Sequence, residues 1–207
     1  MYPVTLQIAN KKIVIVGGGK IAYRKVSGLL QKGAQIVVIS PTLNEEMQQL
    51  LRTETIQWQR KPFEASDVQD AFIVFAATNI PTVNEYVVAS CSSNQLVNRC
   101  DHAQNSSFYV PAVYQNNDLT IAVNTNGVSP LLAKKIRDEA AAKYEYLTER
   151  YFLFLKKVRM QLKQLGLSAE QKNAYLQEVL DEKYATNPAL QQQFLEQLMF
   201  NHCTTQS

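Results

Sequence analysis

The sequence predicts an α/β fold, with a Rossmann-like, doubly wound parallel sheet followed by a small β/α dimerisation segment and a C-terminal helical domain. Two observations support this. Up to about residue 100, continuous apolar runs alternate with helix-like spacers, as in parallel strands covered on both faces. In the last third of the chain, Ala, Leu, Glu, Lys and Gln dominate and apolar residues recur at helical spacing. We therefore expect domains at 1–112, 113–147 and 148–207.

Five segments are expected to form the strands of one sheet, three of them strongly apolar and two weaker. They are Ile13–Val16, Ile36–Ile39, Phe72–Ala76, Ile56–Trp58 and Leu96–Asn98. The spacers that suit crossover helices are Lys20–Lys32, Thr42–Arg52, Val68–Asp70 with its flanks, and Pro81–Ser93. Strand–helix–strand units in series give a parallel sheet with right-handed crossovers.

The pattern changes after this region. Phe108–Tyr114 and Leu119–Asn124 are expected to be strands joined by a turn at Gln115–Asn117. Ser129 is a candidate N-cap, and Pro130 then occupies the first helical position. Breaks in the helical tail are expected at Gly166–Ser168 and Asn187–Pro188.

Composition excludes several classes of protein. The 207 residues, 46% hydrophobic and 19% charged, suffice for a buried core, and the net charge of +3 is too small to indicate a nucleic-acid partner. No apolar run reaches the roughly 18 residues that span a bilayer, and the N-terminus lacks a secretion signal pattern. We expect a cytoplasmic protein without nucleic-acid or membrane partners. The three cysteines and two histidines form no ligand pattern, so no metal site is expected.

A glycine-rich turn follows the first predicted strand and begins the first predicted helix. Gly17-x-Gly19-x-x-Ala22 fits the dinucleotide fingerprint in its required context, which disfavours a purely structural turn. Gly17 permits the tight turn, Gly19 lets the backbone approach a pyrophosphate, and N–H groups at a helix start attract anions. The residues expected to bind the dinucleotide here are Gly17, Gly18, Gly19, Lys20 and Ile21.

The second predicted strand ends on Ser40, Pro41 and Thr42, where Asp or Glu commonly binds the adenine ribose. No arginine follows immediately to receive a 2′-phosphate, so NADP is not favoured and NAD is the expected cofactor, but this motif by itself does not settle which nucleotide binds. Hydroxyl and backbone N–H groups of these three residues can contact the ribose. The alternative is an ordinary strand-to-helix connection.

Thr78 and Asp101 follow two later strands, at the carboxyl ends where ligands collect in open parallel sheets. Thr78 is expected beside the cofactor, with helix capping as an equal alternative. Asp101 can accept a proton or orient a substrate nitrogen, whereas a loop aspartate considered alone is more often a turn former.

These residues belong to a longer pattern. It runs through Tyr2-Pro3, Val16-Gly17-Gly18-Gly19-x-x-Ala22-x-Arg24-Lys25, Leu29-Leu30-x-x-Gly33-Ala34, Ala76-Ala77-Thr78, Val83-Asn84, Asn98-x-x-Asp101, Ser107-Phe108-x-x-Pro111-Ala112 and Gly127-Val128-Ser129-Pro130-x-Leu132-Ala133. Over residues 2–137 the chain thereby resembles the precorrin-2 dehydrogenase family, the N-terminal module of siroheme synthase, in its stand-alone bacterial form.

The resemblance implies NAD-dependent oxidation of precorrin-2 to sirohydrochlorin, a step towards siroheme, by a homodimer. Asp101 matches the catalytic aspartate proposed for the family, so the resemblance implies a general-base or proton-positioning role. The neighbouring His102 is read as an incidental loop residue. Some relatives also insert ferrous iron into sirohydrochlorin, and whether this chain does so is left open.

A second distinctive segment is expected to bind the carboxylate arms of precorrin-2, because a helix N-terminus offers N–H groups to anions. Its candidate substrate-binding residues are Thr125, Asn126 and Ser129, with structural capping as the alternative for Ser129. Some fused relatives carry a regulatory serine where Thr125 stands, so no regulatory role is carried over. The basic stretch at 156–163 is read as a solvated helix face, with attraction of an anionic tetrapyrrole or a partner enzyme as the alternative.

Two non-enzymatic readings stay open at this point. The chain can be a dinucleotide-sensing Rossmann module that acts through a partner, although the tail carries no clear DNA-reading helix. It can also be a degenerate scaffold that binds NAD without turnover. The presence of Asp101 and of the segment Gly127–Pro130 disfavours degeneration.

Overall fold

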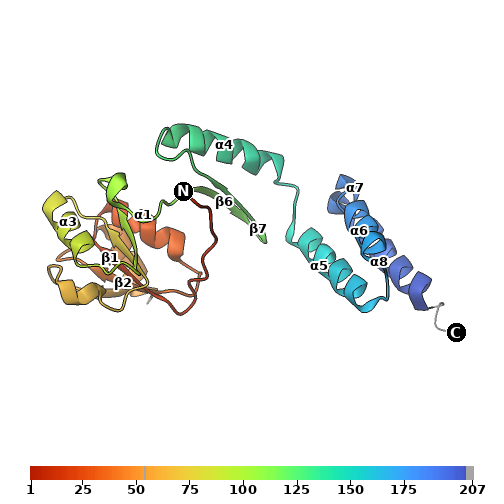
Figure 1. Ribbon diagram of the computed structural model, residues 1–207, viewed down its shortest axis with the longest axis horizontal. Coiled ribbons are helices and arrows are strands. Elements are labelled where there is room, and N and C mark those ends of the chain that lie inside the picture. Colours follow the sequence, from red (N-terminus) through yellow and green to blue (C-terminus); the bar gives the residue numbers. More distant parts are fainter. Residues whose placement is uncertain (54, 204–207) are drawn as a thin grey trace. The chain divides into compact units, whose positions relative to one another are not determined.

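A computed structural model describes residues 1–53 and 55–203 (Figure 1). The chain divides into two compact units, Met1–Val110 and Pro111–Ser207. Each is described separately below. No helix in the described part of the chain is long and apolar enough to cross a membrane.

The first unit is built on a five-stranded parallel sheet in the order β3-β2-β1-β4-β5. Its strands are β1 (Lys12–Val16), β2 (Gln35–Ile39), β3 (Gln57–Gln59), β4 (Ile73–Ala76) and β5 (Leu96–Arg99). The chain first adds β2 and β3 on one side of β1 and then β4 and β5 on the other side. The switch point of this doubly wound fold therefore lies between β1 and β4. The predicted Rossmann-like sheet is confirmed.

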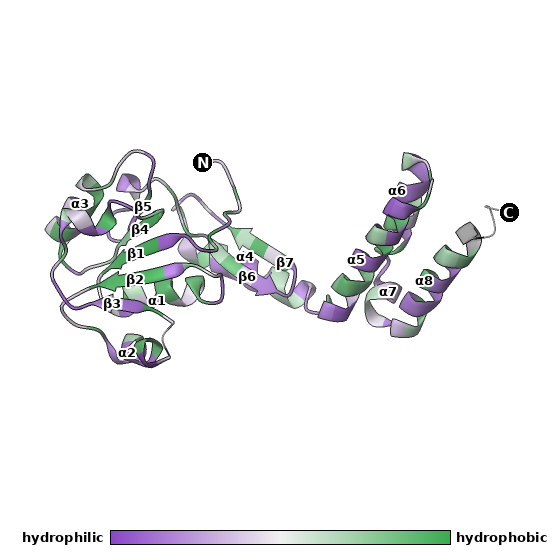
Figure 2. Ribbon diagram, turned by 90° about the horizontal axis from the view of Figure 1, so that it is seen from below, coloured by the Kyte–Doolittle hydropathy of each residue, from purple (hydrophilic) through white to green (hydrophobic). Residues whose placement is uncertain are grey.

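Alternate residues of the central strands supply two hydrophobic cores, one on each face of the sheet. On one face, Ile13 and Ile15 pack with Val26 of α1 (Lys20–Leu29) and Met47 of α2 (Glu45–Arg52). On the other, Val14 and Val16 pack with Val87 of α3 (Pro81–Ala89). Because both faces are covered, the central strands are hydrophobic along most of their length (Figure 2).

The region expected to form a helix around Val68–Asp70 is instead a short 3-10 turn, η1 (Ala65–Val68), so that prediction was wrong. A reciprocal capping box fixes the start of this turn: the Glu64 and Asp67 side chains each accept the other residue's backbone N–H. Lys61 Nζ also lies 2.7 Å from the Asp67 carboxylate. The connection between β3 and β4 therefore contains one 3-10 turn in place of the expected helix.

The strand expected at Phe108–Tyr114 begins only at Ala112. The preceding residues are held beside β5, where Ser107 N donates to Val97 O at 2.8 Å. The side-chain amide of Asn98 also donates to Phe108 O at 3.0 Å. A second short turn, η2 (Ala103–Asn105), precedes them.

The second unit begins with an antiparallel hairpin, β6 (Ala112–Asn116) and β7 (Leu119–Val123), whose turn includes Asn117 at a φ of 49°. The helix α4 (Pro130–Lys143) packs against both strands. Four helices follow: α5 (Glu149–Gln164), α6 (Ala169–Glu178), α7 (Glu182–Thr186) and α8 (Pro188–Cys203).

The helical part of the second unit has its own apolar core. Phe154 and Val158 of α5 lie at its centre, with Tyr184 and Phe194 packed around Phe154 at ring-centroid distances of 5.9 Å each. Ser168 caps α6 through a capping box, and Pro188 begins α8, so both predicted breaks of the tail fall between helices.

Candidate functional site

A cavity of about 720 Å³ opens at the carboxyl ends of β1, β2 and β4. All nine residues that the sequence assigned to cofactor binding line it: Gly17, Gly18, Gly19, Lys20, Ile21, Ser40, Pro41, Thr42 and Thr78. Three separate loops bring them together, one after each of these strands. This is the crevice at which open α/β sheets bind nucleotides.

The glycines differ in what surrounds them. A Cβ on Gly17, whose φ is +126°, would lie 2.4 Å from Ala77 O, and one on Gly18 would lie 2.0 Å from Thr42 O. A Cβ on Gly19 would meet no atom within 4 Å. The first two glycines therefore let neighbouring loops pack closely, whereas Gly19 faces open space.

The start of α1 is suited to an anionic group. Gly19 is its N-cap residue and supplies no side-chain cap, and the first turn carries no acidic residue. The first backbone N–H groups of a helix have no intrahelical acceptor, and the helix dipole adds partial positive charge there. These features fit the pyrophosphate of a dinucleotide.

The loop after β2 is internally bonded. Ser40 is buried, and its hydroxyl donates to Thr42 O at 2.8 Å. Trp58 Nε1 donates to Ser40 O at 2.9 Å. Ser40 thus lines the cavity but uses its hydroxyl proton to shape the loop, while Thr42 is exposed at its rim.

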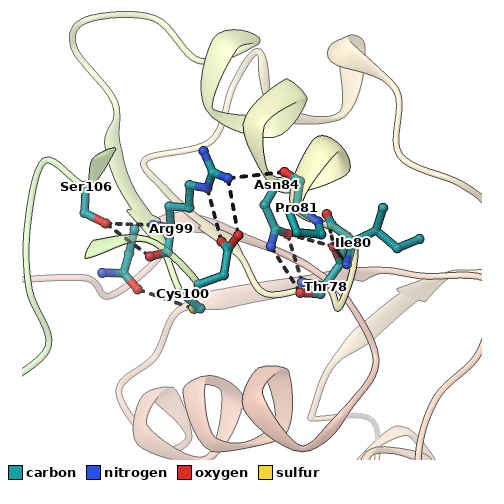
Figure 3. Close-up of polar contacts among 9 residues, drawn as sticks. Thr78, Ile80, Pro81, Asn84, Arg99, Cys100 and Ser106 are labelled. Carbon is teal, nitrogen blue, oxygen red and sulfur yellow. Dashed lines mark hydrogen bonds and ion pairs between the residues drawn. The ribbon is translucent and has the colours of Figure 1, made fainter. Parts of the chain in front are cut away.

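Asn84 fixes the loop after β4 (Figure 3). This side chain is fully buried, and its Oδ1 accepts from Thr78 N at 3.0 Å and from Thr78 Oγ1 at 2.8 Å. Its amide nitrogen donates to Thr78 O at 3.1 Å. Thr78 also accepts from Ile80 N, at the N-cap position of α3, so it borders the cavity and steadies the helix start.

Asp101 follows β5 and forms a two-point ion pair with Arg99. Arg99 Nε lies 3.1 Å from Oδ1, and Nη2 lies 3.3 Å from Oδ2. Partial burial alone would raise the pKa of Asp101, but hydrogen bonds from Arg99, its own backbone N–H and Asn84, with the charge of Arg99, hold it below its ordinary value. Asp101 is therefore an ionised carboxylate at neutral pH.

Asp101 is not among the residues that line the cavity. Its partner Arg99 donates to Pro81 O at 3.3 Å at the start of α3, the helix whose Asn84 bonds the cavity-lining Thr78. The carboxylate and the nucleotide crevice are thus linked through the start of α3, at the carboxyl ends of neighbouring strands β4 and β5.

Sequence reasoning missed several residues of this site. Phe63 lines the cavity from the segment after β3, and Ile80 and Val83 line it from the start of α3. Phe63 could have been predicted from its place shortly after the end of β3, because ligands bind at the carboxyl ends of parallel strands. Asn84 belongs to the pattern that carries the resemblance but was given no role, and buried Arg99, beside Asp101, had no signal in the sequence.

The three expected substrate-binding residues lie in the second unit. Ser129 is the N-cap of α4, and its hydroxyl accepts from Leu132 N at 3.2 Å. Thr125 Oγ1 accepts from Ser129 N at 3.1 Å and donates to Ser129 O at 3.0 Å. Asn126 has a φ of 50° and donates its N–H to Asn124 Oδ1. The segment is therefore a locally bonded turn at a helix start.

Among the residues whose side chains are described, no group of three His, Cys, Asp or Glu could hold a metal ion. The side chains of His202 and Cys203 lie outside that set. Burial raises the pKa of the Cys91 thiol to about 11 and that of Cys100 above its ordinary value. Both are therefore protonated at neutral pH.

Comparison with known proteins agrees with this geometry. An NAD(P)-binding family matches residues 4–112, the central family of sirohaem biosynthesis proteins matches 116–141, and the SirC C-terminal domain family matches 148–194. A solved structure of SirC, a precorrin-2 dehydrogenase, superposes with a TM-score of 0.82 at 32% identity, covering 96% of this chain and 99% of that one.

Two curated relatives are also precorrin-2 dehydrogenases. That of Priestia megaterium is 32% identical over 198 residues, which are 96% of this chain and 98% of the relative. That of Bacillus subtilis is 33% identical over 138 residues, which are 67% of this chain and 85% of the relative.

Proposed function

The chain belongs to the precorrin-2 dehydrogenase family, and on that premise we propose that it oxidises precorrin-2 to sirohydrochlorin with NAD as the electron acceptor. The observation that carries the proposal is the contact of the Arg99–Asp101 ion pair with the start of α3, the helix whose Asn84 fixes the cavity-lining Thr78. When bound, NAD supplies the hydride-accepting nicotinamide. The chain supplies binding, orientation and proton handling.

Each part of the site has a distinct task in this proposal. The N–H groups at the start of α1 bind the pyrophosphate, and the open space at Gly19 admits it. The loop of Thr78, fixed by Asn84, borders the reacting end of the cofactor. Asp101, held ionised by Arg99, positions a pyrrole nitrogen and accepts the proton lost with the hydride.

We propose that the segment Thr125, Asn126 and Ser129 binds carboxylate arms of the substrate. The start of α4 has no acidic residue in its first turn, which supports anion binding. Because Ser129 also caps the helix, Ser129→Gly is the informative change. A glycine cap loses only a few tenths of a kcal/mol, so a rise in the KM for precorrin-2 would report lost substrate contact.

We also propose that the second unit forms a homodimer. A two-stranded hairpin is marginal alone, and this unit exposes apolar side chains on the hairpin, on α4 and on the segment between them: Val113, Val128, Leu131, Leu132 and Ile136. A second copy of the chain would cover them. Leu131→Glu should lower the mass measured by light scattering from dimer to monomer, whereas an unchanged mass would reject this surface.

The test of the function is an anaerobic assay with precorrin-2 and NAD. The dehydrogenase predicts NADH and sirohydrochlorin in equal amounts. A dinucleotide sensor or degenerate scaffold would bind NAD and produce neither. Ferrous iron as a second substrate is tested separately, by adding Fe²⁺ to sirohydrochlorin and following siroheme, since the resemblance alone leaves chelation open.

A further inference from the structure

A second hollow, of about 460 Å³, lies next to the cofactor cavity. Pro41, Thr42 and Leu43 line both, so the two spaces meet at the loop after β2. In the general geometry of this fold, that loop borders the adenine ribose, whose 2′ position carries the extra phosphate of NADP. What the hollow presents to this position therefore bears on cofactor choice.

The hollow is basic. Arg52, at the end of α2, and Arg60, just after β3, line it together with Trp58. The Arg60 guanidinium lies 5.8 Å from the centroid of the Trp58 ring, over which it stacks. Neither arginine forms an ion pair with another residue in the described part of the chain, and no lining residue of the hollow is acidic.

The loop after β2 also lacks the feature that excludes NADP. An Asp or Glu there would bond the ribose hydroxyls and repel a 2′-phosphate, whereas this chain has Ser40 and Thr42. Trp58, which lines the hollow, donates its Nε1–H to Ser40 O and so connects the hollow to that loop. Guanidinium groups bind phosphate in two-point geometry and stay charged at any working pH.

Taking the proposed function as its basis, we propose that Arg52 and Arg60 form a subsite for the 2′-phosphate of NADP, so that this enzyme uses NADP as well as NAD. The sequence-based expectation against NADP considered only the residues directly after β2. The two arginines come from the end of α2 and from beyond β3, and only the folded sheet brings them to that loop.

The hollow contains its own probe, because Trp58 is the only tryptophan of the chain. Titration of the full chain with adenosine 2′,5′-bisphosphate and with 5′-AMP, followed by Trp58 fluorescence and by calorimetry, isolates the 2′-phosphate. We expect the bisphosphate to bind at least about tenfold more tightly at constant ionic strength, a difference of one decade in Kd. Calorimetry gives both constants even where fluorescence does not change.

Variants of Arg52 and Arg60 test whether these two side chains cause the preference for the bisphosphate. Arg60→Gln and Arg52→Gln should each reduce the preference for the bisphosphate while leaving the Kd for NAD within about twofold. Arg60→Lys keeps the positive charge but loses the two-point donor geometry of the guanidinium, so it should keep part of the preference for the bisphosphate. Arg159→Gln in α5 makes the same charge change outside this hollow and should have no effect. NADP-supported oxidation of precorrin-2 should fall in Arg60→Gln while NAD-supported oxidation does not.

Equal affinities for the two nucleotides in the unaltered chain would overturn the subsite, as would an undiminished preference in the double variant of Arg52 and Arg60. These outcomes differ from failure of the proposed function. In that case precorrin-2 is not oxidised with either cofactor, although the binding preference for a 2′-phosphate is still measurable.

Discussion

Arg99 holds both oxygens of the Asp101 carboxylate, at 3.1 and 3.3 Å, and the same guanidinium donates to Pro81 O at the start of α3. The Arg99 side chain is 9% exposed and that of Asp101 is 30% exposed. The arginine thus anchors the acid from inside the protein while leaving it open to a substrate. The orientation and ionisation of Asp101 depend on this one partner more than on any other side chain.

Replacing Arg99 should change the pH dependence of catalysis. In Arg99→Gln the carboxylate loses its strongest partner, so the pKa of Asp101 rises and a larger fraction is protonated at mildly acidic pH. The acid limb of the kcat profile should therefore move to higher pH. Lys183→Gln, which breaks an exposed ion pair with Asp181, is the matched control and should leave the limb unchanged.

The same pair should contribute to stability in a defined pH range. The folded pKa of Asp101 is lower than its ordinary value, so its contribution is present above the unfolded pKa of about 3.9 and is lost as pH falls through the folded value. We expect Asp101→Asn to cost no more than about 1 kcal/mol near pH 7, because the pair is partly exposed. Urea unfolding should show the two proteins converging below about pH 4. A difference that persists at low pH would contradict the ion pair.

Two alanine substitutions in the glycine turn should separate folding from cofactor binding. Gly18→Ala places a Cβ 2.0 Å from Thr42 O, which is backbone, so the loops must move apart at a cost of about 1–3 kcal/mol. Gly19→Ala meets nothing within 4 Å and should leave stability nearly unchanged. Its methyl group occupies the approach to the helix start, so the Kd for NAD should rise at least about tenfold. Normal NAD affinity in Gly19→Ala would place the pyrophosphate elsewhere.

Destabilising the helical core of the second unit should leave NAD binding by the first unit unchanged. Leu162 is 2% exposed in α5, and Leu162→Ala should cost about 2–5 kcal/mol of that region's stability. If 148–207 is a separate domain, calorimetry should show one transition shifted down in temperature while NAD binding at 25 °C is retained. A single shifted transition, with loss of NAD binding in step, would reject the domain division.

Much of the first unit could be predicted because its physical requirements are local. Strands buried on both faces need continuous apolar runs, such as Ile13–Val16, and these are visible in the sequence. The strand ends then locate the cofactor residues, because parallel strands bring their carboxyl ends to one edge. The glycine turn was recognisable because Gly17 and Gly18 leave no room for a Cβ, while Gly19 keeps the approach to the helix start open.

What could not be predicted depends on residues that meet only in the folded chain. Asn84 of α3 bonds Thr78 after β4, and Arg99 of β5 donates to Pro81 O at the start of α3, so these contacts have no sequence spacing of their own. Arg60, which follows β3, likewise lines the same hollow as Pro41 and Thr42 of the loop after β2. The helix predicted around Val68–Asp70 is only the turn η1, whose start is fixed by the capping pair Glu64 and Asp67.

The most direct test of the central claim compares the unaltered enzyme with Asp101→Asn under anaerobic conditions. NAD affinity is measured first by calorimetry, and NADH formation is then followed after addition of precorrin-2. Because Asp101 does not line the cavity, we predict an unchanged Kd for NAD and a rate lowered at least about 100-fold, as for loss of a proton-transfer group. Equal rates of NADH formation in the two proteins would contradict the account.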